Sequence, residues 1–180
     1  VTSQQRAQMQ ILSLSINVLG QGIPFLHLGS ELLRSKSMQR DSYDSGDWFN
    51  TVNFDMSNNN WNVGLPRQDK DGDNWPLIQT IIEDPQAQPT SADIKWTDTR
   101  FKELLKIRTS SPLFSLTTEE EIQARVDFQN TGSDSITGLI VMSIDDGTTA
   151  GIDLANLKGW DFLLNKSRKR IISITNLSFY

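Results

Sequence analysis

Charged and aromatic side chains gather in one short segment, where they could bind a polar ligand. They are Arg34, Lys36, Arg40, Asp41, Tyr43, Asp44 and Asp47. The segment follows the apolar run "IPFLHL", which has the length and composition of a buried strand. Ligands of parallel α/β folds bind beyond the carboxyl ends of the strands, so this position favours a binding rim. No two acids are spaced as a demonstrable acid/base pair, so the segment alone does not predict catalysis.

The single histidine limits nucleophilic and metal chemistry. A Ser-His-Asp triad or a histidine-metal site would require His27, and the absence of cysteine excludes thiol catalysis and thiolate ligands. His27 lies inside the apolar run, between Leu26 and Leu28. A packed, hydrogen-bonded histidine is therefore favoured over a catalytic one.

The stretch "DKDGDNW", residues 69–75, resembles the beginning of a calcium-binding loop. Its acids stand at alternate positions, as in an EF-hand. The EF-hand pattern also requires glycine at its sixth position and a bidentate acid at its twelfth, where this sequence has Asn74 and Thr80. The EF-hand interpretation therefore fails, and a polar turn is favoured over a looser calcium site.

Three tryptophans, Trp48, Trp61 and Trp75, lie among Asn and Asp in a segment without regular periodicity. An aromatic plane beside directed hydrogen-bonding groups suits carbohydrate recognition, because the apolar face of a sugar ring stacks while its hydroxyls are bound. Tryptophans that pin a long loop are the structural alternative. For each tryptophan taken individually, the structural alternative is favoured.

Hydrophobic periodicity predicts an α/β unit in the first part of the chain. Apolar residues at helical spacing predict a helix over residues 4–19 that is buried on most sides. Gly20 and Gly22 end it. The apolar run at residues 23–28 then predicts a strand covered on both faces, in a parallel sheet.

The rest of the chain divides into a loop, a helix and a β-rich part. Residues 30–89 show no sustained period, and long loops of this kind are usually functional. Helical spacing returns at residues 91–108, and Pro112 ends it. Beyond that proline, β-like runs at residues 124–128 and 136–144 predict antiparallel hairpins.

The composition describes a globular protein of about one domain. The chain has 180 residues, of which 22% are charged and 37% hydrophobic, and its net charge is −5. This charge gives no electrostatic reason to expect a nucleic acid partner, and no apolar run has the length of a membrane span. The chain begins with Val1 and shows no cleavage pattern, so we expect it to be a piece of a larger protein.

Five motifs follow one another along the chain: "GIPFLHLGSE", "LRSKS", "RDSYDSGDWFN", "SSPLF" and "DFQNTG". Their order and spacing resemble the C-terminal part of pullulanase-type α-1,6-glucosidases of the α-amylase superfamily, over about residues 4–154. The resemblance implies an α/β plus β fold. Residues 1–111 would be the last strand-helix portion of a (β/α)8 TIM barrel, and residues 112–180 the start of a C-terminal antiparallel β-sandwich. The tail after about Gly159 departs from the family, and we expect a shifted reading frame or a truncated gene product there rather than divergence.

The resemblance also implies an activity, and it implies which part of the parent protein carries the catalytic residues. The family hydrolyses α-1,6 branch linkages in pullulan, limit dextrins and related glucans with retention, using an Asp nucleophile, a Glu acid/base and a second Asp. All three would lie upstream of Val1, so this chain would be inactive alone and would supply a loop of the substrate cleft. Asp41 and Tyr43 would contact glucose units, and Arg34 and Asp47 would orient the loop through charge-assisted hydrogen bonds.

The resemblance implies partners but no cofactor for the chemistry, although a structural calcium ion is compatible with the parent enzyme. The expected partners are an α-glucan, such as pullulan, a limit dextrin or amylopectin, and the upstream barrel of the same parent chain. Localisation would be extracellular or at the cell surface in a bacterium and plastidial in a plant. Two alternatives stay open: a non-catalytic carbohydrate-binding module that uses the Trp-rich loop, and a calcium-binding structural domain that rests on Asp69, Asp71 and Asp73.

Overall fold

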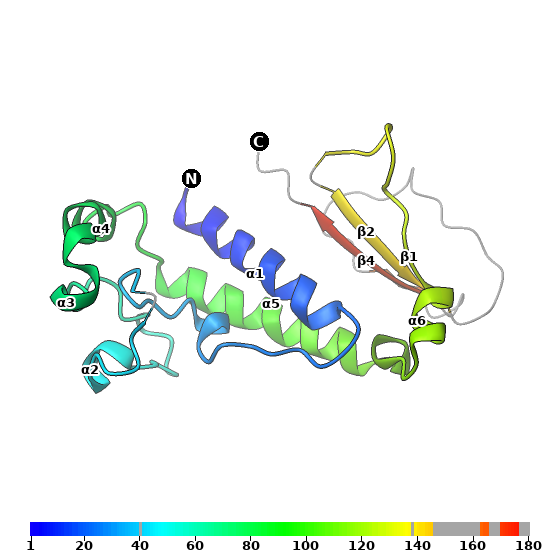
Figure 1. The fold of residues 1–180 in the computed structure, drawn as a ribbon, viewed down its shortest axis with the longest axis horizontal. Helices are drawn as coiled ribbons and strands as arrows, with labels where there is room; N and C mark the ends of the chain where they lie inside the picture. The colour runs from blue at the N-terminus through cyan, green and yellow to red at the C-terminus, as the bar shows by residue number, and fades with distance from the viewer. Residues whose placement is uncertain (40, 138, 146–162, 166–169, 177–180) are drawn as a thin grey trace. The chain divides into compact units, whose positions relative to one another are not determined.

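In a computed structural model of the chain, helices form most of the regular structure (Figure 1). The structure describes residues 1–39, 41–137, 139–145, 163–165 and 170–176. The helices are α1 (Ser3–Leu19), η1 (Ser30–Leu32), α2 (Asp47–Asn50), α3 (Gln68–Asp71), η2 (Gly72–Asn74), α4 (Trp75–Ile82), α5 (Ser91–Thr109), η3 (Pro112–Ser115) and α6 (Glu119–Arg125), where η marks a 3-10 helix. The strands are β1 (Val126–Phe128), β2 (Leu139–Ile144), β3 (Leu163–Asn165) and β4 (Arg170–Asn176). No helix within these ranges is long and apolar enough to cross a membrane.

The chain folds into two compact units, and α1 and α5 each contribute residues to both. Unit 1 comprises Val1–Ile11 and Leu26–Phe101, and unit 2 comprises Leu12–Phe25 and Lys102–Tyr180. The domain boundary predicted near residue 112 stays a prediction.

In unit 1, a buried carboxylate joins the first turns of α1 and α5. Asp93 Oδ2 accepts hydrogen bonds from the backbone N–H of Thr90 at 2.8 Å and from Ser3 Oγ at 2.9 Å. Burial alone would raise the pKa of Asp93, but the hydrogen bonds from Thr90 and Ser3 outweigh it and lower this pKa. The neighbouring Ile94 is completely buried, and Ile11 is 2% exposed. The apolar stripes that predicted these helices therefore form the core of this unit.

In unit 2, an arginine satisfies the end of α1. The last carbonyls of a helix have no partner within the helix. Arg108 Nη1 donates to Val18 O at 2.7 Å and to Gly20 O at 2.8 Å. Gln21 continues the connection, because its Nε2 donates to Leu113 O at 2.8 Å. These bonds hold the end of α5, and the turn that follows it, against the end of α1.

The strands form one antiparallel sheet in the order β1-β2-β4-β3. Val126 pairs with Ile144 across β1 and β2, and Leu139 pairs with Asn176 across β2 and β4. β2 lies inside the sheet and is buried from Val141 to Ile144. The hairpin predicted from the runs at residues 124–128 and 136–144 is confirmed. The tail after about Gly159 was expected to depart from the family, and most of it lies outside the described residues. Only β3 and β4 are described in this part of the chain.

The two long helices predicted at residues 4–19 and 91–108 are confirmed as α1 and α5. The burial predicted for α1 was too extensive, because Met9 and Ile16 are 43% and 54% exposed. Within residues 30–89 the chain forms the short helices α2, α3 and α4 instead of an unbroken loop.

The predicted fold class is wrong for this chain. Residues 23–28, expected to form the last strand of a (β/α)8 barrel, are not in a strand, and Ile23 and Phe25 are 82% and 84% exposed. Every strand in the described ranges pairs antiparallel in a single sheet, so the structure shows neither a parallel barrel unit nor the start of a sandwich. A buried parallel strand needs paired neighbours and covered faces. No described segment pairs with residues 23–28.

A matched pair of substitutions tests which helix face carries the core. Ile94→Ala is expected to lower the free energy of unfolding by about 2–5 kcal/mol, because it leaves a cavity in a fully buried site. The same substitution at the exposed Ile16 is expected to change it by less than about 0.5 kcal/mol. Urea unfolding followed by circular dichroism measures both values. Equal losses would contradict the burial described here.

Candidate functional site

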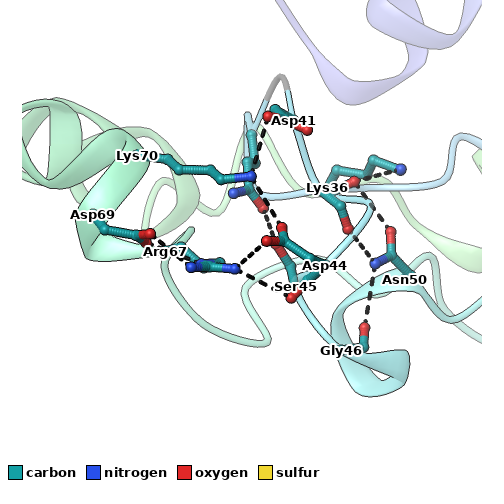
Figure 2. Close-up of polar contacts among 11 residues, drawn as sticks. Lys36, Asp41, Asp44, Ser45, Gly46, Asn50, Arg67, Asp69 and Lys70 are labelled. Atoms are coloured by element: carbon teal, nitrogen blue, oxygen red, sulfur yellow. Dashed lines mark hydrogen bonds and ion pairs between the residues drawn. The ribbon is translucent and has the colours of Figure 1, made fainter.

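A network of ion pairs joins the loop that contains Asp41 and Asp44 to the short helix α3 and the residue before it in unit 1 (Figure 2). Its members, which we call the loop ion-pair network, are Asp41, Asp44, Arg67, Asp69 and Lys70. Lys70 Nζ lies 3.1 Å from Asp41 Oδ2 and 3.0 Å from Asp44 Oδ1. Arg67 Nη1 contacts Asp44 Oδ2, and Arg67 Nη2 lies 2.6 Å from Asp69 Oδ2. Because Asp44 contacts both cations, it ties the segment that contains Asp41 to the segment that contains Lys70.

The cations around Asp44 stabilise its charged form. The hydrogen bond from Lys70 lowers the pKa of Asp44, and the positive charge of Arg67 lowers it further, against an opposing effect of desolvation. In turn, the hydrogen bond to Asp44 raises the pKa of Lys70, and Asp41 adds to this effect. An acid with a lowered folded-state pKa stabilises the folded state above its unfolded-state pKa, and this contribution is lost as the pH falls through the folded-state value. The network is therefore intact at neutral pH and weakens in acid.

Arg34 and Asn50 close the loop that follows residue 34. Arg34 Nη1 donates to Leu28 O at 3.0 Å, and Arg34 Nη2 donates to Asn50 O at 2.8 Å. Asn50 Nδ2 in turn donates to Ser42 O at 2.6 Å (Figure 2). Gly29 has a φ of +89°, and a Cβ there would lie 2.7 Å from Arg34 Cδ. Glycine is therefore needed at this position both for the backbone conformation and for the passage of the arginine side chain.

The structure brings two of the four predicted site residues together. Asp41 and Tyr43 both contact Lys70, whose Nζ lies 4.6 Å from the centre of the Tyr43 ring. Tyr43 is nevertheless 83% exposed, and the side chain of Asp41 is 52% exposed. Arg34 lies at the base of the loop, and the exposed Asp47 begins α2 outside the network. The roles of all four residues stay predictions.

Two of the three tryptophans hold the fold through their indole N–H groups. Trp61 Nε1 donates to Ile82 O at 2.9 Å, and Trp75 Nε1 donates to Pro66 O at 2.8 Å. Both bonds are partly buried, which agrees with the interpretation that these tryptophans hold a long loop in place. Trp48 differs, because it is 56% exposed.

Two glycines and a phenylalanine fix the exposed ring of Trp48. Its ring meets that of Phe49 edge to face, with centroids 5.4 Å apart. A Cβ on Gly46 would lie 3.0 Å from Trp48 Nε1, and one on Gly64 would lie 3.1 Å from Trp48 Cη2. The indole is therefore held close to the backbone while much of its surface stays open to solvent.

His27 does not occupy the packed position that was expected. It is exposed, because the segment around it forms no strand that other elements could cover. His27 is instead one of the residues that line a pocket of unit 1.

The three acids of "DKDGDNW" have separate surroundings. Asp69 pairs with Arg67, Asp71 is 6% exposed, and Asp73 is exposed. The part of the chain that the structure describes contains no group of three or more His, Cys, Asp or Glu side chains that could hold a metal ion. The calcium alternative gains no support from this arrangement.

Sequence reasoning missed Lys70, Arg67 and Asn50. The stretch "DKDGDNW" draws attention to its acids, whereas the residue that organises the loop is its lysine. The partners of Lys70 lie 29 and 26 positions earlier in the chain. Alternating charge in both segments is the only signal for such a pairing, and it does not specify which charges meet.

A protein-family comparison decides which family this chain belongs to. The model of the family "Alpha-1,6-glucosidases, pullulanase-type, C-terminal" matches residues 56–175. The chain belongs to this family. The resemblance inferred from the five motifs is therefore confirmed.

Curated pullulanases match most of this chain but are much longer. "Pullulanase 1, chloroplastic" of Arabidopsis thaliana is 53% identical over 147 residues, which are 82% of this chain and 15% of the relative. The pullulanase of Klebsiella pneumoniae is 51% identical over 149 residues, which are 83% of this chain and 14% of the relative. The chain thus spans only about one seventh of the length of these relatives.

Solved pullulanase structures share this fold. The maltotriose complex of PulA from Klebsiella pneumoniae matches with a TM-score of 0.74 and 51% identity, over 79% of this chain and 15% of that one. The mostly helical arrangement with one antiparallel sheet is therefore that of a part of a pullulanase. The same comparison shows that this relative binds maltotriose.

Removing the Lys70 cation tests the electrostatics of the network. Lys70→Met is expected to raise the pKa of Asp44, because the hydrogen bond from Lys70 is the main cause of its lowering. The carboxyl carbon shift of Asp44, followed by NMR against pH, measures this pKa. Lys106→Met, which removes an exposed lysine from α5, is the control. An Asp44 pKa that is equal in both variants would contradict the pairing.

Proposed function

We propose that this chain is the glucan-holding segment of a pullulanase-type enzyme that hydrolyses α-1,6-glucosidic linkages in starch-like and pullulan-like glucans with retention. Membership in the family supports this activity for the parent protein, as do the pullulanases that are 53% and 51% identical over 82% and 83% of the chain. The upstream part of the same parent chain is the partner that such an enzyme requires.

The observation that carries the proposal is the joint placement of Asp41 and Tyr43. Both side chains are largely exposed, yet both contact one ammonium group, that of Lys70. A carboxylate accepts hydrogen bonds from sugar hydroxyls, and an aromatic ring covers the apolar face of a sugar. Lys70 covers one face of the Tyr43 ring and leaves most of the residue open to a ligand. Because the side chains of Asp41 and Tyr43 are positioned before the ligand arrives, less conformational entropy is lost when a glucan binds.

Two further residues support the loop, and a third extends it. Arg34 holds the carbonyls of Leu28 and Asn50, which fixes the base of the loop. Asp47 begins α2, the short helix that carries the exposed Trp48. We assign Arg34 and Asp47 to the support of the loop and Trp48 to a second stacking surface.

The chemistry itself is assigned to residues outside this chain. Retaining glycosidases require a nucleophile and an acid/base whose carboxyl groups are about 5–5.5 Å apart. The acids of the loop network are instead neutralised by Lys70 and Arg67, and Lys70 and Arg67 lower the pKa values of Asp44 and Asp69 respectively. An acid held in its charged form cannot donate a proton at neutral pH. We also propose that a domain boundary of the parent protein lies between residues 111 and 112, with this loop in the first of the two domains.

Maltotriose binding tests the glucan-holding role. The 180-residue chain is expected to bind maltotriose with a dissociation constant of about 1 mM, as suits a few contacts on one loop. Tyr43→Ala is expected to weaken this binding about fivefold through lost stacking, and Asp41→Asn is expected to weaken it as well. Asp134→Asn, an exposed acid in the β1-β2 connection, is the control. NMR titration measures all four proteins, and equal affinities would contradict the proposal.

Incubation with pullulan tests the proposal that the isolated chain has no hydrolytic activity. The chain alone is expected to release no reducing ends above a protein-free blank, because the catalytic acids are assigned to the upstream part of the parent. A reducing-sugar assay measures the release. Hydrolysis by the isolated chain would show that the assignment of the acids is wrong, without bearing on maltotriose binding.

A further inference from the structure

A pocket of unit 1 outside the loop network is lined by two arginines and by several residues with hydrogen-bond donors. Its volume is about 280 Å³, near the lower end of the range for small-ligand sites. Polar and aromatic residues that line it are Arg6, Gln10, His27, Arg34, Asn59 and Trp61. No Asp or Glu is among its lining residues.

The amide side chains of the pocket keep hydrogen-bond donors available. Gln10 Nε2 donates one hydrogen to Ser30 O at 3.2 Å, and Asn59 Nδ2 donates one to Leu33 O at 2.6 Å. Each amide nitrogen carries two hydrogens, so each keeps a second donor. Asn59 is 6% exposed and therefore has a fixed orientation. The imidazole of His27 adds an N–H in either protonation state.

The positive charge of the pocket is not neutralised by the contacts around it. The Nη atoms of Arg34 bond to carbonyl and amide oxygens, and its Nε is buried without a hydrogen-bond partner. Neither Arg6 nor Arg34 takes part in a salt bridge within the described ranges. Asp93, which is bonded to the lining residue Ser3, brings one negative charge close to the pocket, whereas Arg6 and Arg34 bring two positive charges, so the balance of these three groups stays positive. A group with negative charge and several acceptor oxygens would match these donors.

We propose that this pocket binds the phosphate group of a small ligand, either free phosphate or a sugar phosphate. Arginine recognises phosphate through charge-assisted hydrogen bonds, and the remaining amide and imidazole donors suit its other oxygens. A neutral glucan would leave the excess positive charge uncompensated, so this site differs in chemistry from the Asp41 and Tyr43 loop. The indole N–H of Trp61 is already bonded to Ile82 O, so Trp61 offers its ring rather than a donor. That ring suits the sugar of a sugar phosphate.

Titration of the 180-residue chain with three ligands tests the proposal. Inorganic phosphate and glucose 6-phosphate are expected to bind, as measured by isothermal titration calorimetry in a phosphate-free buffer, and glucose is not expected to compete with either. Tighter binding of glucose 6-phosphate would identify a sugar phosphate as the ligand, whereas equal binding would identify free phosphate. If neither phosphate binds at about 10 mM, or if glucose competes with them, the proposal is overturned.

A matched pair of arginine substitutions assigns the binding to the pocket. Arg6→Gln is expected to weaken phosphate binding about tenfold, because it removes a charge-assisted contact and keeps a good helix former on α1. Arg125→Gln removes a guanidinium from α6 that does not line the pocket, and it is expected to leave the affinity unchanged. Circular dichroism of both variants confirms that the helices are retained. An equal loss of phosphate affinity in the two variants would mean that the affinity depends only on the net charge of the chain, which would overturn the assignment.

Discussion

The ammonium group of Lys70 lies between two carboxylates that precede it by 26 and 29 positions and under an aromatic ring from the same segment. Single exposed ion pairs contribute little to stability, because solvent screens them and their side chains lose entropy. Here the pairs share members, since Asp44 also contacts Arg67, which pairs with Asp69. A shared network restricts several side chains at once. Its main effect is therefore to position the loop rather than to stabilise the chain.

We assign glucan binding to the loop of this chain, where cations neutralise the acids, and catalysis to acids in the upstream part of the parent protein. The network pairs the acids of the loop with Lys70 and Arg67, and the side chain of Asp41 stays 52% exposed, so its carboxylate can accept hydrogen bonds from a ligand. The aromatic rings of Tyr43 and Trp48 add apolar surface beside it, and both stay more than half exposed. The pocket that contains Arg6 has the opposite character, with positive charge and donors. We therefore propose separate places in unit 1 for two ligand chemistries, neutral sugar and phosphate.

The sequence predicted the elements whose signals are local. The helical spacing of α1 and α5 and the alternation of β1 and β2 are confirmed, because each pattern depends on neighbours a few residues away. Residues 23–28 were misassigned, since a continuous apolar run describes a strand only where other strands and helices cover it. Helix α6 was missed although Thr118 and Glu121 mark its beginning, with the Glu121 N–H donating to Thr118 Oγ1 at 3.2 Å. In the site, composition singled out Asp41 and Tyr43 but could not supply Lys70, because that contact depends on the fold.

The central claim is that Lys70 holds Tyr43 and the neighbouring acids in one arrangement in solution. Nuclear Overhauser effects between the side-chain methylene protons of Lys70 and the ring protons of Tyr43 test it most directly, since the Lys70 nitrogen lies 4.6 Å from the ring centre. The account predicts that these effects are present at neutral pH and low salt, and that they weaken in Asp44→Asn. Their absence in the unmodified chain at neutral pH and low salt would contradict it.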